Sequence, residues 1–397
     1  MSMPSTDAST LPAVRGGRRW SLAAAIASVT VFGLSVGQGG PLMPLLLEER
    51  GTDTTLNGLN AGAMFMGVLI GPLLAPWFVQ RCGIRNFVLA CLGLDMVLFL
   101  ALKPLDSLTA WFLLRPLGAV VGSAIFTAGE AWINQLAGDA GRGRVLGIYA
   151  AALSAGFGIG PLVLSLTGID GWPPFLVNAA ITALAGLPLL GTRGASLAPG
   201  RRGSSPLRMF ARAPVIVATV GAFGLFESAL MSLLPIWGVR SGMTQQLAAM
   251  GLSAVYIGSI VLQVAIGWLS DRVSRLAALR LCGAVGLAGA LALLGAAGLP
   301  PVVFVLLFLW GGIASGIYPI ALSMAGDRFR DGDLVSVNAA MIMAYGMGAM
   351  LGPPLGGLAM DLRNPQGLLW LFAALFTALL GGSLLISRSH RAGPGPV

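Results

Sequence analysis

Charged residues are scarce in this sequence. Asp, Glu, Lys and Arg make up 10% of the 397 residues, whereas apolar residues make up 56%. With such a composition, a water-soluble domain of this length would lack a polar surface. The scarcity of charge therefore excludes an ordinary soluble protein and predicts a chain that lies mostly within a membrane.

Histidine and cysteine are rare as well. The single histidine is His390, near the C-terminus, so no imidazole can carry protons within the apolar stretches. Cys82, Cys91 and Cys282 show no paired spacing, which indicates neither a disulfide framework nor a metal-ligand cluster. No Ser/His or Cys/His pair is available either. We therefore expect no enzyme activity, no cofactor and no metal.

The sequence does contain twelve apolar stretches that are long enough to cross a bilayer. A helix needs roughly 20 apolar residues to span a hydrocarbon core of about 30 Å. Many of the 57 glycines lie inside these stretches, where small residues let helices approach closely. We expect an all-α integral membrane protein with spans at 20–47, 57–80, 86–102, 108–136, 145–168, 173–191, 214–238, 247–270, 276–297, 301–325, 334–360 and 367–387.

The twelve stretches form two halves that repeat each other. Phe-Gly-Leu at 32–34 recurs at 223–225, and Arg81 recurs as Arg272, both at an offset of 191 residues. A duplicated six-helix half is typical of transporters whose substrate site lies between the halves, near the middle of the bilayer. The repeat predicts two pseudo-symmetric six-helix bundles around a central cavity, at 20–191 and 214–387.

The distribution of Lys and Arg predicts the orientation in the membrane. If the N-terminus is cytoplasmic, nineteen of the 24 basic residues fall on the cytoplasmic side, four on the outer side, and Arg115 within a span. Cytoplasmic segments of membrane proteins carry such an excess. We therefore expect a multi-pass protein of a bacterial inner membrane with both termini in the cytoplasm. Anionic lipid accounts for the net charge of +9, so no nucleic-acid partner is expected.

The segments outside the bundles are polar or rich in Gly, Ser and Pro. They are predicted to be a disordered N-terminal tail at 1–19, a cytoplasmic linker at 192–213 and a cytoplasmic tail at 388–397.

A short motif follows the eighth span and has an altered copy after the second. The first reads Gly-Trp-Leu-Ser-Asp-Arg-Val-Ser-Arg at 267–275, and the second has Gln80 where the first has Asp271. These loops resemble the cytoplasmic gating loop of the major facilitator superfamily, and the resemblance covers essentially the whole chain. In that family the Asp faces a helix N-terminus of the opposite half and closes the cytoplasmic side. With Gln80 in one copy, the two gates should be unequal. The gating residues that the resemblance implies are Arg81, Gly83, Gly267, Asp271, Arg272 and Arg275.

Motifs of glycine and proline occur in the fifth and eleventh spans. The eleventh-span motif is similar to the antiporter signature of the drug/proton exporters in the same superfamily, and residues 40–44 resemble a run in the first helix of those exporters. We expect the small residues to pack helices tightly across the interface between the halves. Alternatively, they only hold helices together and imply no direction of transport. The residues are Gly156, Gly160, Pro161, Gly348, Gly352 and Pro353.

Four ionisable residues fall inside the predicted spans, where a charge is costly and usually faces a cavity or a partner. Asp95 and Arg115 lie ten residues either side of the turn at Leu105. Both are therefore roughly 15 Å below that turn on antiparallel neighbours. We interpret them as a structural ion pair. The alternative, which the resemblance implies through the family's fourth-helix Arg, is that Arg115 takes part in proton release.

Glu130 and Glu227 have no obvious partner at matching depth. A carboxyl group removed from water can take up and release a proton near neutral pH, which coupling to a proton gradient requires. We predict that these two residues carry the coupling. Alternatively, each is permanently protonated and only donates a hydrogen bond. Polar residues of the cavity-lining spans could contact the substrate or instead satisfy a backbone carbonyl, and the candidates are Gln38, Tyr149, Tyr256, Gln263 and Tyr345.

Together these features favour a proton-coupled exporter of a small amphipathic or cationic molecule, because no Arg cluster lies in the core spans to hold an anion. An importer or an uncoupled facilitator would share the fold, and a membrane receptor or enzyme is the remote alternative. We expect a monomer whose partners are the substrate, protons and membrane lipid.

Overall fold

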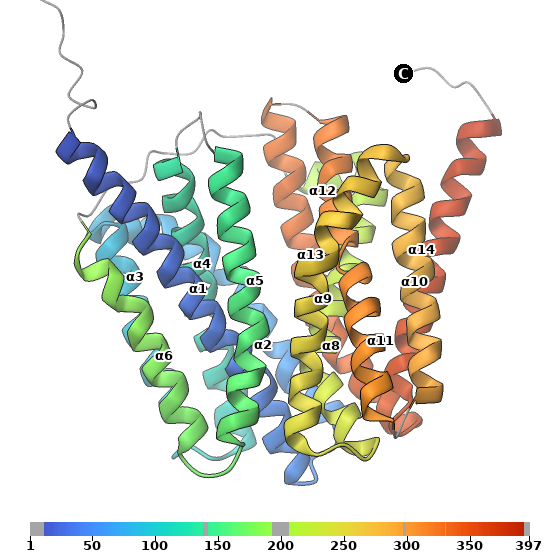
Figure 1. Cartoon of the computed structure of the whole chain (residues 1–397), viewed down its shortest axis with the longest axis horizontal. Helices are drawn as coiled ribbons and strands as arrows, with labels where there is room; N and C mark the ends of the chain where they lie inside the picture. The colour runs from blue at the N-terminus through green and yellow to red at the C-terminus, as the bar shows by residue number, and fades with distance from the viewer. Residues whose placement is uncertain (1–11, 138–141, 193–205, 297–298, 330, 393–397) are drawn as a thin grey trace, which may run out of the picture.

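A computed structural model describes residues 12–137, 142–192, 206–296, 299–329 and 331–392, which are almost entirely helical (Figure 1). No β-strand occurs in this part of the chain. The helices are α1 (Pro12–Glu49), α2 (Thr54–Cys82), α3 (Ile84–Ala101), α4 (Leu108–Ala137), α5 (Arg142–Thr167), α6 (Pro173–Leu190), α7 (Pro206–Arg212), α8 (Pro214–Arg240), α9 (Gln245–Arg272), α10 (Arg275–Ala296), α11 (Pro300–Ala314), α12 (Ile317–Arg328), α13 (Asp331–Leu362) and α14 (Gly367–Ala392).

The predicted all-α membrane architecture is confirmed. Among the described residues, eleven helical segments are long and apolar enough to cross a membrane. One of them combines α11 and α12, which are separated only at Ser315 and Gly316. The remaining long helix is α13, which packs against α2 and α8 within the bundle and corresponds to the predicted eleventh span. The predicted count of twelve is therefore close to the eleven segments that meet both criteria.

The first and last helices extend beyond the predicted spans, which end where the apolar pattern stops. α1 begins at Pro12, so 12–19 are helical and not a disordered tail, and α14 continues to Ala392. Ala and Arg favour helix in water too, so the apolar pattern shows where the membrane ends and not where the helix ends. The predicted linker contains α7, while 1–11, 193–205 and 393–397 lie outside the described residues.

Local sequence explains several helix boundaries. α6, α8 and α11 begin with Pro173, Pro214 and Pro300, because the first position of a helix needs no N–H donor and suits the fixed φ of proline. Gly83 alone connects α2 to α3, at φ 78°. A side chain is strained in this left-handed region, so the turn itself requires glycine at this predicted gating position.

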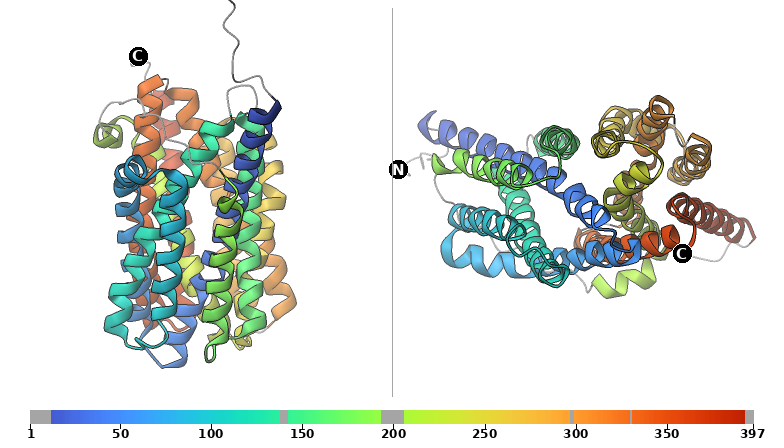
Figure 2. Two further views of the ribbon diagram at one scale, coloured as in Figure 1. Left: turned by 90° about the vertical axis from the view of Figure 1, so that its left-hand side faces the viewer. Right: turned by 90° about the horizontal axis from the view of Figure 1, so that it is seen from below.

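The helices form two bundles, α1–α6 and α8–α14, in which neighbours recur in the same pattern (Figures 1 and 2). α1 packs against α5 and α6 in the first bundle, as α8 packs against α13 and α14 in the second. Between the bundles, α2 lies beside α13 and α5 lies beside α9. The ends of α1 and α14 nearest the chain termini lie on one side, called here the terminal side, which is at the top of Figure 1.

The predicted role of four glycines at the interface between the halves is wrong. A Cβ atom at Gly156 or Gly160 would overlap backbone atoms of α1, and one at Gly348 or Gly352 would overlap the backbone of α8. Each pair therefore packs its helix against the first helix of its own half. Spacing alone identifies a small-residue face but not the helix that it meets.

Other residues make the close contact between the bundles. A Cβ atom at Gly58 of α2 would overlap the carbonyl oxygen of Pro353 in α13, and one at Gly357 of α13 would overlap the carbonyl oxygen of Thr54. Of the predicted motif residues, Pro353 thus does lie at this interface. Pro161 is buried.

Candidate functional site

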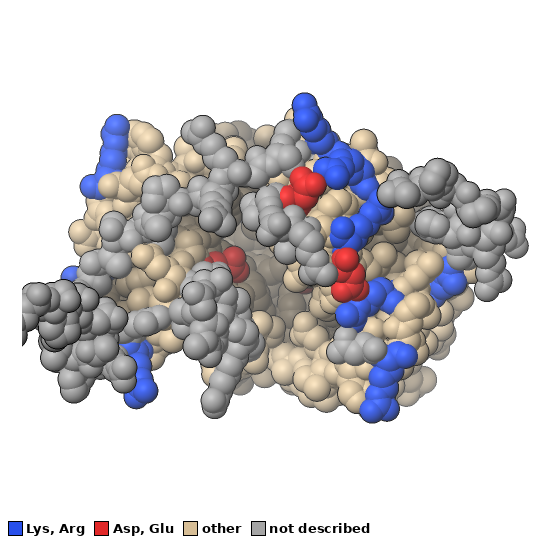
Figure 3. All heavy atoms as spheres, turned by 90° about the horizontal axis from the view of Figure 1, so that it is seen from above, with Lys and Arg blue, Asp and Glu red and all other residues tan. Residues whose placement is uncertain are grey.

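A cavity of about 610 Å³ lies between the two bundles. Seen from the terminal side, the surface is hollowed between the halves, and an acidic side chain is visible in the hollow (Figure 3). The lining is mostly apolar but includes the four residues predicted as intramembrane charges, which are Asp95, Arg115, Glu130 and Glu227. Positions far apart in the sequence are thus brought to one site, three from the first bundle and one from the second.

Each of the two glutamates accepts a hydrogen bond from a tyrosine on a neighbouring helix. The Tyr149 hydroxyl of α5 lies 3.0 Å from Oε1 of Glu130 on α4. The Tyr345 hydroxyl of α13 lies 2.8 Å from Oε2 of Glu227 on α8. The expectation that these carboxyls have no obvious partner is therefore wrong. Tyr345 is 118 residues from Glu227, so depth within the spans gave no indication of this contact.

Aromatic rings form a row from one half to the other. Phe32 packs against Phe126 at 5.3 Å between ring centroids, Phe126 against Phe157 at 6.1 Å, and Phe157 against Tyr256 of α9 at 6.0 Å. All four residues line the cavity. The last two pairs are stacked, at 22° and 23° between ring planes, and present flat apolar surface to a ligand.

Asp95 and Arg115 do not form the predicted ion pair. Both line the cavity, but in the described part of the chain no contact joins them. Arg115 instead donates a hydrogen bond to Oδ1 of Asn60, a fully buried residue of α2. Equal depth on adjacent antiparallel helices does not fix which face of each helix a side chain occupies, and this explains the error.

The other residues predicted to line the cavity differ in where they lie. Tyr256 and Tyr345 line the cavity, and Tyr149 reaches it through Glu130. Gln38 is fully buried, donates to the carbonyl of Pro174 at 3.0 Å and thus satisfies a backbone group, as the alternative interpretation held. Gln263 is exposed and is not part of the lining.

Sequence reasoning missed Tyr318 of α12, which lines the cavity with its ring 6.4 Å from that of Tyr345. It follows the interruption between α11 and α12 directly, so no motif pointed to it. Sequence reasoning also missed Asn60, because a single amide within an apolar stretch belongs to no recognisable motif.

The two predicted gating loops make matching contacts within their own halves. The guanidinium of Arg81 lies 3.7 Å from the ring centroid of Trp77, and that of Arg272 lies 3.7 Å from the ring centroid of Trp268. Arg275 binds Asp327 of α12 at 3.1 Å and also the Ser270 hydroxyl at 2.8 Å. Gly267 has open space around its Cα. The side chain of Asp271 lies outside the described part of the chain.

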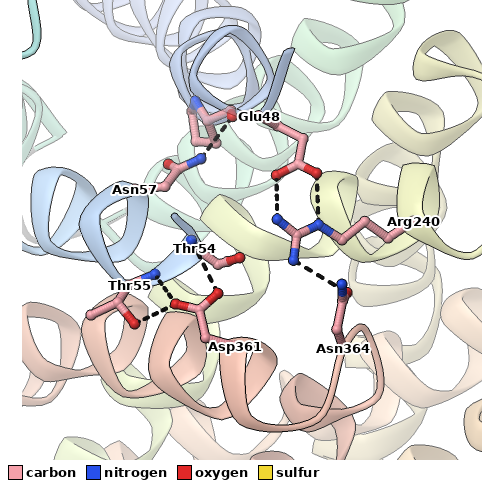
Figure 4. Close-up of polar contacts among 8 residues, drawn as sticks. Glu48, Thr54, Thr55, Asn57, Arg240, Asp361 and Asn364 are labelled. Atoms are coloured by element: carbon pink, nitrogen blue, oxygen red, sulfur yellow. Dashed lines mark hydrogen bonds and ion pairs between the residues drawn. The ribbon is translucent and has the colours of Figure 1, made fainter. Parts of the chain in front are cut away.

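On the side opposite the termini, polar contacts join the two bundles (Figure 4). Glu48 at the end of α1 binds Arg240 at the end of α8 through two hydrogen bonds, of 2.6 and 2.8 Å. Arg240 also donates to Oδ1 of Asn364 at 3.2 Å. The two charged side chains are largely buried, which strengthens this bidentate pair relative to one in water.

A second contact on this side places Asp361, near the end of α13, at the N-terminus of α2. Its carboxylate accepts hydrogen bonds from the backbone N–H of Thr54 at 3.2 Å, from that of Thr55 at 2.8 Å, and from the Thr55 hydroxyl at 2.5 Å. A carboxylate is favoured at the positive end of a helix. Partial burial alone would raise the pKa of Asp361, but the hydrogen bonds from Thr55 and Thr54 outweigh it and hold the pKa below its usual value.

Comparison with known proteins gives the same protein family along almost the whole chain. The sequence profile of the Major Facilitator Superfamily matches residues 21–311 and 241–396. An uncharacterized MFS-type transporter of Bacillus subtilis, YfkF, is 26% identical over 346 residues, which are 84% of this chain and 87% of that protein. A second uncharacterized MFS-type transporter, from an Enterobacter strain, is 26% identical over 380 residues, 92% of this chain and 94% of its own.

Solved structures share the fold at lower identity. A crystal structure of a mutant of the nucleoside transporter NupG has a TM-score of 0.76 and 16% identity, and covers 93% of this chain and 99% of that one. A bacterial homologue of the lysosomal transporter Spinster, in an inward-facing and occupied conformation, has a TM-score of 0.73 and 17% identity, and covers 96% of this chain and 99% of its own.

Proposed function

The chain belongs to the major facilitator superfamily of membrane transporters, and we propose that it exports a small amphipathic or cationic organic molecule in exchange for protons. The observation that carries this proposal is the presence of two carboxyl groups, Glu130 and Glu227, on opposite halves of one largely apolar cavity. Each is held by a tyrosine of its own half.

The chemistry of the lining supports both parts of the proposal. Carboxylates attract a cation, and the aromatic row offers apolar surface for the rest of the molecule. A carboxyl group in such a cavity can bind either a proton or the cation, because two positive charges on one carboxylate repel each other. Competition of this kind couples release of the substrate to uptake of protons.

Alternating access requires the cavity to open to one side at a time. The charged contacts of Glu48, Arg240 and Asp361 hold the side opposite the termini together. The hollow surface lies on the terminal side, which the excess of Lys and Arg predicts to be cytoplasmic. We therefore assign this arrangement to the inward-facing state of a carrier in the bacterial inner membrane, acting as a monomer.

The test uses everted membrane vesicles, whose cytoplasmic face is outside and whose lumen is acidified by respiration. Ethidium and tetraphenylphosphonium serve as aromatic cation probes, with vesicles lacking the protein as the control. We expect protein-dependent uptake of the probe, a matching loss of the pH gradient, and abolition of uptake by an uncoupler. Equal probe movement with and without the uncoupler would establish a facilitator instead, and probe movement in the reverse direction an importer.

A further inference from the structure

We infer that Asp95 and Arg115 form a subsite for a zwitterionic head group, with an ammonium group bound at Asp95 and a carboxylate at Arg115. The inference rests on the proposed function and names the substrate class more closely. The relevant ligand is a small molecule that carries both charges on an apolar body.

The two residues lie at the same depth at one end of the cavity. Asp95 is six residues before the end of α3 at Ala101, and Arg115 is seven residues after the start of α4 at Leu108. At 1.5 Å per residue, they are about 9 and 10 Å from the helix ends on the side opposite the termini. α3 and α4 pack against each other, and both side chains line the cavity.

Their charges are not neutralised by one another. Asp95 forms no hydrogen bond or ion pair with any of the described residues. Arg115 is 7% exposed, and its recorded partner is the neutral amide of Asn60. A guanidinium has five N–H donors, so most of them remain for a ligand in the cavity. An unpaired buried charge is strongly unfavourable, and a ligand of opposite charge relieves that cost.

A ligand with a single charge would satisfy only half of this arrangement. The other two acids lie farther from this end of the cavity, with Glu227 about 20 Å from the end of α8 at Arg240. Glu130 is fifteen residues, or about 22 Å, from Arg115 along α4, and Glu227 lies on the opposite half. A molecule that carries both charges pairs with both residues at once.

The surroundings fit an apolar body attached to that head group. Phe99, Leu114 and Met64 line the same cavity, and the aromatic row of Phe32, Phe126, Phe157 and Tyr256 lines it farther from this end. Amino acids with large side chains and their amphipathic derivatives have this combination of head and body.

The test compares probes that share a body and differ in the head group. The phenyl series is phenylalanine, phenylethylamine and 3-phenylpropionate, and the indole series is tryptophan, tryptamine and indole-3-propionate. Affinities are measured on the purified full-length protein by equilibrium dialysis. We expect each zwitterion to bind about tenfold more tightly than its amine or acid analogue, because it adds one charge-assisted hydrogen-bonded contact.

Substitutions assign the two contacts. Arg115→Gln should remove the advantage of the zwitterion over the amine and leave affinity for the amine within about twofold. Asp95→Asn should remove the advantage over the acid. Ser323→Ala of α12, which is outside the cavity lining, is the control and should change neither ratio. Arg115→Lys keeps the positive charge and should retain most of the advantage of the zwitterion over the amine. If Arg115→Gln does not fold, the affinities of Arg115→Lys for the two probes are measured instead.

The outcomes separate the two proposals. If amines bind as tightly as zwitterions and Arg115→Gln changes neither, the zwitterion subsite is overturned while the proposed cation transport stands. If none of the six probes binds at millimolar concentration, both the subsite and the proposed ligand class of the cavity are overturned.

Discussion

The hydroxyl group of Tyr345 donates a hydrogen bond of 2.8 Å to the carboxyl group of Glu227, across the contact between α13 and α8. The first half contains a similar contact, in which Tyr149 donates to Glu130 at 3.0 Å. A tyrosine can stabilise a carboxylate as donor or accept from a carboxylic acid, so it satisfies either protonation state. The cavity therefore contains two acids whose charge can change without leaving a buried hydrogen-bonding group unpaired.

We predict that Glu130→Gln and Glu227→Gln, each of which keeps one of the two acids, retain probe binding but lose transport driven by a pH gradient. Glutamine has the shape of a protonated glutamate and hydrogen-bonds in a similar way, but it cannot release a proton. Binding of tetraphenylphosphonium by dialysis and uptake into energised vesicles measure the two properties separately. Tyr149→Phe and Tyr345→Phe are the matched controls, and they should slow transport without abolishing its dependence on pH. If both Gln variants transport normally against a gradient, the coupling assignment is wrong.

The closed state on the side opposite the termini should depend on pH only in strong acid. The pKa of Asp361 is lowered in this state, so its contact with α2 is complete above the usual carboxyl value of about 3.9 and is lost as the pH falls through the lowered pKa. Asp361→Asn should therefore reduce the closed population at neutral pH. Because Asp361 is exposed, we expect an effect of about 0.5 to 1 kcal/mol.

The closed population can be measured from the distance between two spin labels, one at Gln80 and one at Ser274. Both residues are exposed, and they lie on different halves at the terminal side. The difference between the wild type and Asp361→Asn should stay constant from about pH 8 to about pH 5, begin to fall below about pH 4, and disappear only below the lowered pKa of Asp361. Arg240→Gln also weakens the closure but removes no carboxyl group, so its difference from the wild type should persist in acid. A change in the Asp361 difference near pH 7 would contradict this assignment.

Gly58→Ala should shift the carrier away from the closed arrangement without preventing folding. The added Cβ atom would overlap the carbonyl oxygen of Pro353 on the other half, and overpacking of this kind costs about 1–3 kcal/mol. Gly156→Ala should instead lower thermal stability in every state, because its overlap is with α1 of the same half. Gly93→Ala, which meets open space, is the control. The label separation and the melting temperature distinguish these effects.

Asp271→Asn should slow transport and favour the state that is open to the terminal side, while Gln80→Asn should have little effect. In the opposite state we expect the Asp271 carboxylate to face the N-terminus of a helix in the other half, an attraction of about 0.3–1 kcal/mol that an amide lacks. Initial rates of probe uptake in vesicles measure the difference. Equal slowing by both substitutions would show that the two loops do not differ as their sequences suggest.

The sequence predicts the fold well because apolar length and the repeat are properties of the chain itself. The 191-residue offset between Arg81 and Arg272 corresponds to the same stack on a tryptophan in both halves. The four intramembrane charges were also identified, since a charge within an apolar stretch is conspicuous, and all four line one cavity.

Side-chain partners were much less predictable. Glu48 and Arg240 are 192 residues apart, and Asp361 and Thr55 are 306 apart, so neither contact has a local pattern. Arg115 was assigned to Asp95 by depth, but its partner Asn60 comes from a third helix. Pairing depends on the rotation of each helix about its axis, and helices with apolar residues on all faces give little indication of that rotation.

The contact of α2 with α13 has a consequence for the free energy of alternating access. Gly58 and Gly357 bring backbone directly against backbone, at Pro353 and at Thr54. Glycine has no side-chain rotamers to lose, so closing this part of the interface does not require ordering of flexible side chains. Opening it exposes backbone carbonyl groups that water can solvate. The free-energy difference between the open and closed states at the contact of α2 with α13 therefore rests on a few hydrogen bonds and ion pairs. The binding free energy of one small molecule is large enough to match it.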